Sequence, residues 1–332
     1  VTVLKDGLFV IVPFSFIDGF KINDKVFLQR DGLTIKCGNG LLGRVVNALG
    51  EPIDDLGKIR DLDTNAPINK ESMSPLDRGI IDQKFATGVK AIDSMLTCGK
   101  GQKVGIFAGS GVGKSTLMGM IVQGCEATIK VIALVGERGR EIPEFIHYNL
   151  NNNLENTVIV TATSDESPLM RKYAAFTAMS IAEYFRDKGH DVLLMMDSVT
   201  RFAMAQREIG LSTGEPPVSR GYPPSVFALL PQGNSKKGSI TAFFTVLVDG
   251  DDLNDPIADQ SRSILDGHIV LTRDLTEQGF YPPINILKSA SRVIDKVVTK
   301  EHYNDFLKLK RVLSLIKENE VLIRVGAYKK GM

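Results

Sequence analysis

The amino-acid sequence predicts an α/β protein built around a parallel sheet. From about residue 84, short apolar runs alternate with stretches of helical periodicity, which is the pattern of buried strands and crossover helices. One of these runs leads into a glycine-rich turn, after which a helix is expected to begin. Before residue 84 the apolar runs are separated by turn residues, so small antiparallel strands are expected there.

The composition is that of an ordinary globular protein. The 332 residues are 43% hydrophobic and 24% charged, and the formal net charge is +1. This balance indicates neither a nucleic-acid-binding surface nor an acidic tail, and no apolar run approaches the roughly 20 residues of a membrane span. The three cysteines have no metal-ligand spacing and cannot form a disulfide framework, so a reducing cytosol is expected.

Residues 1–36 are expected to form part of a small N-terminal β-barrel. Short apolar runs alternate there with turns such as those at Asp18 and Asp31. The chain begins at Val1 inside a predicted strand and has neither an initiator methionine nor a signal peptide. We therefore expect a fragment, or a chain whose ends are missing.

The main domain is expected to follow a hairpin and a linker. Residues 41–61 have the pattern of a hairpin that turns near Gly50, and the polar stretch with Pro67 and Pro75 is predicted to be the linker. Beyond it, the spacing predicts an amphipathic helix over 169–186 and further helix after Thr299. The predicted core strands are 103–107, 131–135, 158–162, 192–196 and 240–248.

The glycine-rich turn has the pattern of a phosphate-binding loop. Its glycines allow a tight turn whose backbone N–H groups point into one concavity, and the helix N-terminus adds partial positive charge. Lys114 can place a full charge on the β and γ phosphates of a nucleotide, and the Ser115 hydroxyl can bind Mg²⁺. The first glycine of the usual pattern is replaced by Ala108, and a turn that merely carries a lysine is the alternative interpretation. The predicted nucleotide-binding residues are Ala108, Gly109, Ser110, Gly111, Val112, Gly113, Lys114, Ser115 and Thr116.

Two acidic residues that follow core strands are candidates for catalysis. Asp197 comes directly after the run 192–196, where a second carboxylate on the Mg²⁺ side is expected; a helix-capping aspartate is the alternative. Glu137 follows the run 131–135, where a carboxylate can polarise a water for attack on the γ phosphorus. Arg138 can orient Glu137 or contact phosphate, although these residues also fit a plain charged loop.

Four segments together resemble the type III secretion ATPases, and within that family most closely the flagellar protein-export ATPases. These proteins are related to the catalytic subunits of rotary ATP synthases. The likeness covers nearly the whole chain in order, and rotary catalytic subunits do not carry the last segment in this form. The segments are the phosphate loop, 136–141, 196–202 and 259–268.

The resemblance implies a role for each residue that matches the family's motifs. Lys114 and Ser115 would bind phosphate and Mg²⁺, and Asp197 would hold the water shell of the metal. Glu137 would be the catalytic base, and Arg138 would reach the γ phosphate.

Two later motifs complete the implied site. Tyr281 would stack on the adenine base, although plain core packing also explains a tyrosine before two prolines. Arg292 would be an arginine finger that acts on the nucleotide of a neighbouring subunit, with a surface salt bridge as the alternative. A finger in every copy implies a homohexamer with sites at the subunit interfaces.

The implied fold is a RecA-like P-loop ATPase core over 37–300, which includes the entry hairpin and linker. A partial β-barrel over 1–36 precedes it, and the start of a C-terminal helical domain over 301–332 follows. The implied activity is Mg²⁺-dependent hydrolysis of ATP to ADP and phosphate, which energises protein export at the cytoplasmic face of a secretion apparatus. The implied partners are a central stalk-like protein, a peripheral regulator, exported proteins and their chaperones, without nucleic acid and with at most peripheral contact with the membrane.

Three other functions compete with this interpretation. A rotary ATP synthase catalytic subunit is disfavoured by the segment 259–268, and a non-catalytic nucleotide-binding subunit by Glu137 and Arg292. A hexameric nucleic-acid translocase is disfavoured by the near-neutral charge. The chain also departs from the family pattern, since it is several residues shorter around 231–235 and shorter at both ends.

Overall fold

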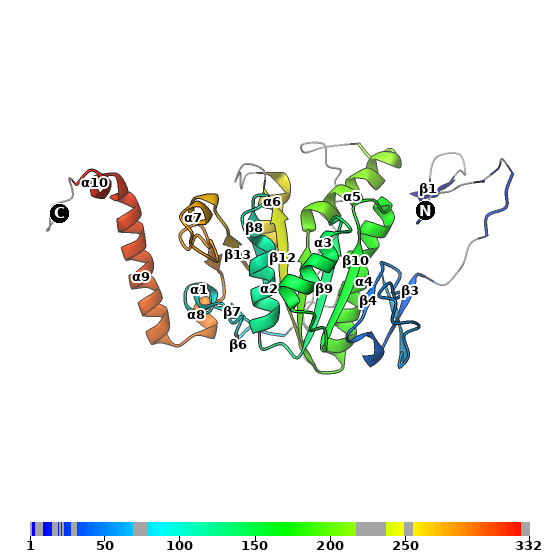
Figure 1. Ribbon diagram of the computed structural model, residues 1–332, viewed down its shortest axis with the longest axis horizontal. Coiled ribbons are helices and arrows are strands. Elements are labelled where there is room, and N and C mark those ends of the chain that lie inside the picture. Colours follow the sequence, from blue (N-terminus) through cyan, green and yellow to red (C-terminus); the bar gives the residue numbers. More distant parts are fainter. Residues whose placement is uncertain are drawn as a thin grey trace.

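The centre of the molecule is an eight-stranded sheet with helices on both faces (Figure 1). The computed structural model describes residues 2–3, 9–14, 19, 21, 23–27, 32–68, 79–216, 237–248 and 255–326. Neighbouring strands of the sheet run parallel, except that β13 and β14 at one edge are antiparallel. The expected α/β class is therefore confirmed.

All five predicted core strands are present, with ends that differ by a few residues. The structure adds two short strands that were not predicted, namely β13 and β14, and it places the predicted hairpin strand β4 in the same sheet. From one edge to the other the order is β14 (Ala290–Ser291), β13 (Gly267–Val270), β8 (Lys103–Ala108), β12 (Ser239–Leu247), β11 (Asp191–Asp197), β9 (Ile129–Val135), β10 (Thr157–Ala162) and β4 (Val45–Val46).

Two hydrophobic cores lie on the two faces of the sheet. On one face, apolar side chains of α4 (Pro168–Asp187) and α5 (Val199–Ser212) pack on alternate residues of the strands. On the other face, α1 (Lys90–Met95) and α2 (Lys114–Gly124) cover the intervening residues. Strands that are buried on both faces are continuously apolar, which explains why these runs could be recognised in the sequence. The predicted helix over 169–186 is confirmed as α4, which begins where the Ser167 hydroxyl accepts a hydrogen bond from the Met170 N–H.

The predicted hairpin over 41–61 is only partly right. Its turn is present, with Gly50 at a φ of 77° and an antiparallel bridge between Val46 and Pro52. However, β4 also pairs in parallel with β10, so this stretch completes the edge of the main sheet. The predicted linker also begins later than expected, because Pro67 is the last residue of β5 (Thr64–Pro67), which pairs with β3 (Thr34–Cys37). Pro75 lies outside the described residues.

The two ends of the chain carry smaller elements. Strands β1 (Thr2–Val3) and β2 (Phe9–Val10) form an antiparallel pair, and part of the predicted barrel over 1–36 lies outside the described residues. The stretch 231–235 lies outside them as well. The helix expected after Thr299 is confirmed as α9 (Lys300–Glu318), which is followed by α10 (Glu320–Arg324). The remaining described elements are η2 (Asn39–Leu41), β6 (Lys84–Phe85), β7 (Cys98–Gly99), α3 (Glu141–Glu144), η4 (Phe145–Asn149), α6 (Pro256–Ile264), α7 (Arg273–Glu277) and α8 (Ile294–Val297).

None of the helices in the described ranges combines the length and the apolar character needed to cross a membrane.

Candidate nucleotide-binding site

The predicted phosphate loop joins the end of the buried strand β8 to the start of α2. Gly111 and Gly113 have φ angles of 77° and 98°, a backbone conformation that favours glycine. Lys114 is the first residue of α2, so its side chain starts where the free N–H groups and the dipole of the helix are concentrated. The strand–loop–helix arrangement predicted from the sequence is confirmed.

The loop forms one wall of a cleft with a volume of about 490 Å³. Side chains from the ends of β9, α3 and α5 form the other walls, so loop residues and catalytic candidates share one space. Ala108 and Val112 are the exceptions, because both are buried in the core under the loop. The predicted residues that line the cleft are Gly109, Ser110, Gly111, Gly113, Lys114, Ser115, Thr116, Glu137 and Arg138.

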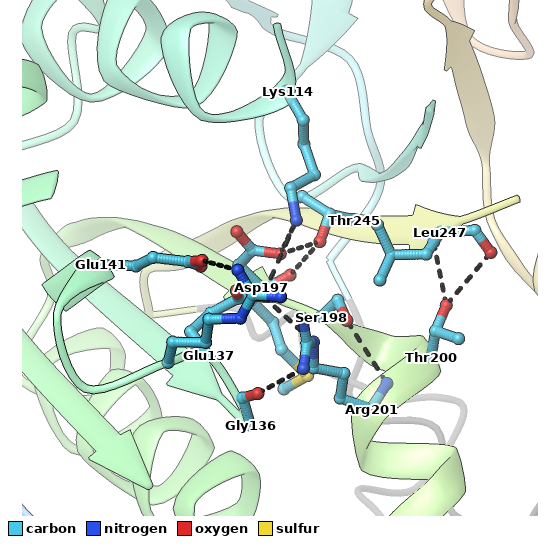
Figure 2. A network of polar contacts seen from close by, with 12 residues as sticks. Lys114, Gly136, Glu137, Glu141, Asp197, Ser198, Thr200, Arg201, Thr245 and Leu247 are labelled. Atoms are coloured by element: carbon cyan, nitrogen blue, oxygen red, sulfur yellow. Dashed lines mark hydrogen bonds and ion pairs between the residues drawn. The ribbon is translucent and has the colours of Figure 1, made fainter. Parts of the chain in front are cut away.

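The two candidate carboxylates meet the loop lysine (Figure 2), although Asp197, unlike Glu137, is not among the residues that line the cleft. Lys114 Nζ lies 2.6 Å from Asp197 Oδ1 and 3.8 Å from Glu137 Oε1. The register explains this meeting, since β9 and β11 are parallel neighbours and Asp197 pairs with Leu134. Both carboxylates are buried, and a buried charge needs a partner of opposite sign, which Lys114 supplies.

Thr245 on β12 holds the Asp197 carboxylate in place and was not predicted. Its hydroxyl donates to Asp197 Oδ1 at 2.7 Å and is completely buried (Figure 2). This hydrogen bond restrains the rotation of the carboxylate.

Arg201 on α5 is a second residue that was not predicted, and it lies against Glu137 (Figure 2). Its Nε lies 3.4 Å from Glu137 Oε1, and its Nη1 donates to the Gly136 carbonyl oxygen at 2.6 Å. Gly136 has a φ of 72°, and a Cβ there would lie 3.0 Å from the Arg201 Cδ atom. The close approach of the arginine therefore requires this glycine.

The environment of Glu137 raises the pKa of its carboxyl group to about 7. Burial is the main cause, and the nearby charge of Asp197 adds to it, whereas the charges of Lys114 and Arg201 act in the opposite direction. Glu137 Oε1 is buried and accepts no hydrogen bond from the described residues. A carboxyl group with a pKa near neutrality is suited to take a proton from water.

Arg138 lines the same cleft but does not contact Glu137. Its guanidinium is exposed and its Nη1 lies 3.7 Å from Glu141 Oε1. Of the two roles expected for Arg138, orientation of Glu137 is thus performed by Arg201 in this structure.

Tyr281 lies near Gly113, at the end of the phosphate loop. A Cβ placed on Gly113 would be 3.9 Å from the Tyr281 Cε1 atom, so the ring is next to the start of α2. The side chain is 62% exposed, which is more than plain core packing would leave and agrees with a ring that is open to a ligand.

Arg292 lies near the start of strand β8, at the opposite end of this strand from the phosphate loop. Its N–H donates to the Asp266 carbonyl oxygen at 2.9 Å, and the Asp266 N–H donates to the Lys103 carbonyl oxygen at 2.8 Å. Lys103 is the first residue of β8, and the loop begins about 17 Å further along at ~3.3 Å per residue. The exposed Arg292 side chain donates to the Arg262 carbonyl oxygen at 2.9 Å and is not among the residues that line the cleft.

Comparisons with known proteins bear on this site. Residues 88–291 match the model of the ATP synthase alpha/beta family, nucleotide-binding domain, and residues 298–332 match the C-terminal domain of the type III secretion ATPase EscN. The flagellum-specific ATP synthase of Helicobacter pylori strain J99 is 60% identical over 337 residues, which is 100% of this chain and 77% of that protein. This chain belongs to the type III secretion ATPase family.

Other members of the family agree with this assignment. The type 3 secretion system ATPase of Xanthomonas euvesicatoria is 47% identical over 98% of this chain and 74% of its own length. The structure of the assembled ATPase EscN from enteropathogenic E. coli matches with a TM-score of 0.91 and 50% identity, and the match covers 96% of this chain and 79% of EscN. EscN in complex with its central stalk EscO matches with a TM-score of 0.89 and 49% identity, over 96% and 78% of the two chains. The resemblance predicted from the motifs is confirmed.

The residues of this type III secretion ATPase fit a magnesium ion that is shared with a nucleotide. Ser115 and Asp197 offer a hydroxyl and a carboxylate, which are the oxygen ligands that Mg²⁺ prefers. Within the described part of the chain, no group of three or more His, Cys, Asp or Glu residues could hold a metal by itself. A Mg²⁺ site with few protein ligands is typical where the phosphates of a substrate complete the coordination.

Proposed function

We propose that this chain hydrolyses ATP to ADP and phosphate with Mg²⁺, and that hydrolysis energises protein export through a type III secretion apparatus of the flagellar kind. The observation that best supports this function is that Lys114 of the phosphate loop forms ion pairs with both Asp197 and Glu137. One cation and two carboxylates with different environments can bind a nucleotide, hold a metal and accept a proton.

Each candidate residue takes one part in the proposed reaction. The loop N–H groups and Lys114 bind the β and γ phosphates, and Ser115 and Asp197 hold Mg²⁺. The metal neutralises charge that develops on the phosphate oxygens when it is bound. Glu137 accepts the proton of the attacking water, and Arg201 keeps its carboxylate oriented. Arg138 reaches the γ phosphate from its exposed position.

The nucleotide base and the neighbouring subunit complete the proposed site. Tyr281 stacks on adenine beside the phosphate loop. Arg292 stabilises the transition state in the site of a neighbour, because the sheet keeps it away from the cleft of its own chain. Such head-to-tail contacts form a closed ring when the rotation between subunits permits it, and we propose a homohexamer. The relative EscN is described as assembled and as bound to a central stalk, which supports this arrangement.

The remaining assignments are also proposals by analogy with the family. They are a partial barrel over 1–36, an ATPase domain over 37–300 and the start of a helical domain over 301–332. The proposed partners are a central stalk-like protein, a peripheral regulator, exported proteins and their chaperones, at the cytoplasmic face of the apparatus. The match of residues 298–332 to the C-terminal domain of EscN favours this role over that of a rotary ATP synthase subunit.

Isothermal titration with a non-hydrolysable ATP analogue and Mg²⁺ tests the proposed site. Lys114→Ala removes the cation that faces the phosphates, so we expect affinity to fall by at least about tenfold. Lys100→Ala is the matched control, because Lys100 Nζ makes a comparable ion pair with Asp191 Oδ2 at 2.8 Å outside the cleft. Equal affinity of the Lys114 variant and the wild-type protein would mean that the loop does not bind nucleotide.

A further inference from the structure

The position of Arg292 depends on contacts behind a very short strand. Strand β14, which directly precedes it, contains two residues and pairs with β13 at the edge of the sheet. Two residues provide too few backbone hydrogen bonds to fix a strand alone. The side chains that contact β14 from the interior therefore decide where Arg292 is presented.

The Gln102 carboxamide makes these interior contacts. Its Nε2 donates to the Asp266 carbonyl oxygen at 2.9 Å and to Ser291 Oγ at 3.3 Å. Its Oε1 accepts the Gly99 N–H at 2.9 Å, so both ends of the amide are used. The Asp266 oxygen also accepts the Arg292 N–H. Gln102 is completely buried. It connects Asp266, which accepts the Arg292 N–H, to Ser291, which precedes Arg292 in the chain.

The neighbouring backbone is shaped to let Gln102 reach this place. A Cβ on Gly267 would lie 2.8 Å from the Ala290 carbonyl oxygen and 3.0 Å from Gln102 Nε2. Ser291 Oγ in turn donates to the Thr97 carbonyl oxygen at 2.8 Å. The edge strand is therefore held from two sides, and the Gln102 amide is the central group.

This arrangement gives a role to the segment 259–268. The segment supplies the Asp266 carbonyl oxygen for the Arg292 backbone and the Arg262 carbonyl oxygen for its guanidinium. It also supplies His268, whose Nε2 lies 3.0 Å from the Lys288 carbonyl oxygen just before β14. The segment 259–268 thus supplies the main contacts to Arg292 and to the residues just before β14.

We propose that Gln102 is a positioning residue for Arg292, and that through it Gln102 controls hydrolysis in the site of a neighbouring subunit. Gln102 lies at the start of β8, at the opposite end from the phosphate loop of its own chain. Loss of its amide should therefore leave nucleotide binding intact and displace the arginine that serves the neighbour. The proposal rests on the proposed action of Arg292 between subunits.

The first test is Gln102→Met, which keeps the volume of the side chain and removes its hydrogen bonds. We expect turnover to fall by about 10- to 100-fold, because displacement of a catalytic group by about 1 Å has effects of this size. Affinity for a non-hydrolysable ATP analogue and KM should stay within about twofold of the wild-type values. Ser291→Ala removes a smaller part of the same hydrogen-bond network and should also lower turnover.

A matched control separates positioning from a general loss of stability. Thr177→Val removes a fully buried hydrogen bond, in which Thr177 Oγ1 donates to the Ala48 carbonyl oxygen at 2.6 Å. Thr177 lies on α4, on the α4–α5 face of the sheet and away from β14. We expect this variant to keep its turnover. An equal loss of turnover in Thr177→Val and Gln102→Met would overturn the proposal.

Mixed assemblies test whether Gln102 acts between subunits. A Gln102→Met subunit keeps its own Glu137, and a Glu137→Gln subunit keeps Gln102 and Arg292. With random mixing, about one interface in four combines both intact groups, so some turnover should return. A mixture of Gln102→Met with Arg292→Ala should not recover, because both variants lack the same function.

The pattern of recovery distinguishes the possible failures. Recovery of Arg292→Ala with Glu137→Gln, but not of Gln102→Met with Glu137→Gln, would overturn the Gln102 proposal alone. Failure of both mixtures, in assemblies shown to be mixed by light scattering, would overturn the action of Arg292 between subunits and the Gln102 proposal with it. Neither result would affect the assignment of the phosphate loop, which the Lys114 titration tests separately.

Discussion

Glu137→Gln should abolish most hydrolysis and at the same time stabilise the fold at high pH. The carboxyl group has a pKa of about 7 in the folded protein, compared with 4.5 for an ordinary glutamate. Between these values the folded protein binds a proton that the unfolded chain releases, so stability is lost as the pH rises through this window. Above pH 7 the buried charge costs roughly 3 kcal/mol, since one pKa unit corresponds to about 1.4 kcal/mol.

The neutral amide avoids this cost, and the advantage grows with pH. From pH 5.5 to pH 8.5 we expect the free energy of unfolding of Glu137→Gln, relative to wild type, to increase by about 2 kcal/mol. Urea unfolding of the nucleotide-free protein, followed by far-UV circular dichroism because the chain has no tryptophan, measures it. Turnover of the same variant should fall by roughly 10²-fold or more.

Asp54→Asn is the control for the same chemical change at another carboxylate. A hydrogen bond from Arg44 lowers the pKa of Asp54 to about 2, so this group stays ionised throughout the measured range. The variant should be destabilised by an amount that does not change between pH 5.5 and 8.5. If the stability difference between Glu137→Gln and wild type were also independent of pH, or if turnover were near normal, the assignment of Glu137 as a buried base would be wrong.

Two further predictions concern residues around the cleft. The pH profile of kcat/KM should have an acidic limb near pH 7. Arg201→Ala should move this limb to higher pH, because the positive charge that lowers the Glu137 pKa is lost. If the limb stayed at the same pH in Arg201→Ala and in Arg201→Lys, the contact between Arg201 and Glu137 would be contradicted. In a calorimetric titration, Tyr281→Ala should bind an ATP analogue about tenfold more weakly because stacking is lost, whereas Tyr281→Phe should bind as the wild-type protein does. Equal affinities of all three proteins would mean that Tyr281 has only a structural role.

The central strands and the phosphate loop could be predicted because their local sequence determines them. Strands buried on both faces require continuous apolar runs, and the loop requires glycines at fixed spacing. The edge strand β14 was missed because two residues carry no readable period. Strand β4 was predicted as part of a hairpin but not as part of the main sheet, because its pairing with β10 is a tertiary contact.

In the candidate site too, residues with a local sequence signal were predicted, whereas residues placed by tertiary contacts were not. Asp197 and Glu137 were found because parallel strands end at a common edge of the sheet. Thr245 and Arg201 were missed, since their contacts depend on the register of β12 with β11 and on the start of α5 against β9. Their positions at the end of a core strand and one turn into a helix were the available signals, but many residues share them.

The dependence of specific ATPase activity on protein concentration tests whether Arg292 of a neighbour completes each active site. If each site is completed by Arg292 of a neighbour, turnover per subunit should rise steeply through the concentration at which light scattering shows assembly, and reach a plateau above it. Arg292→Ala should assemble and bind nucleotide like the wild-type protein but stay roughly 10³-fold less active at every concentration. Specific activity that remains constant on dilution below the assembly threshold would show that one chain contains a complete active site, and would contradict the account.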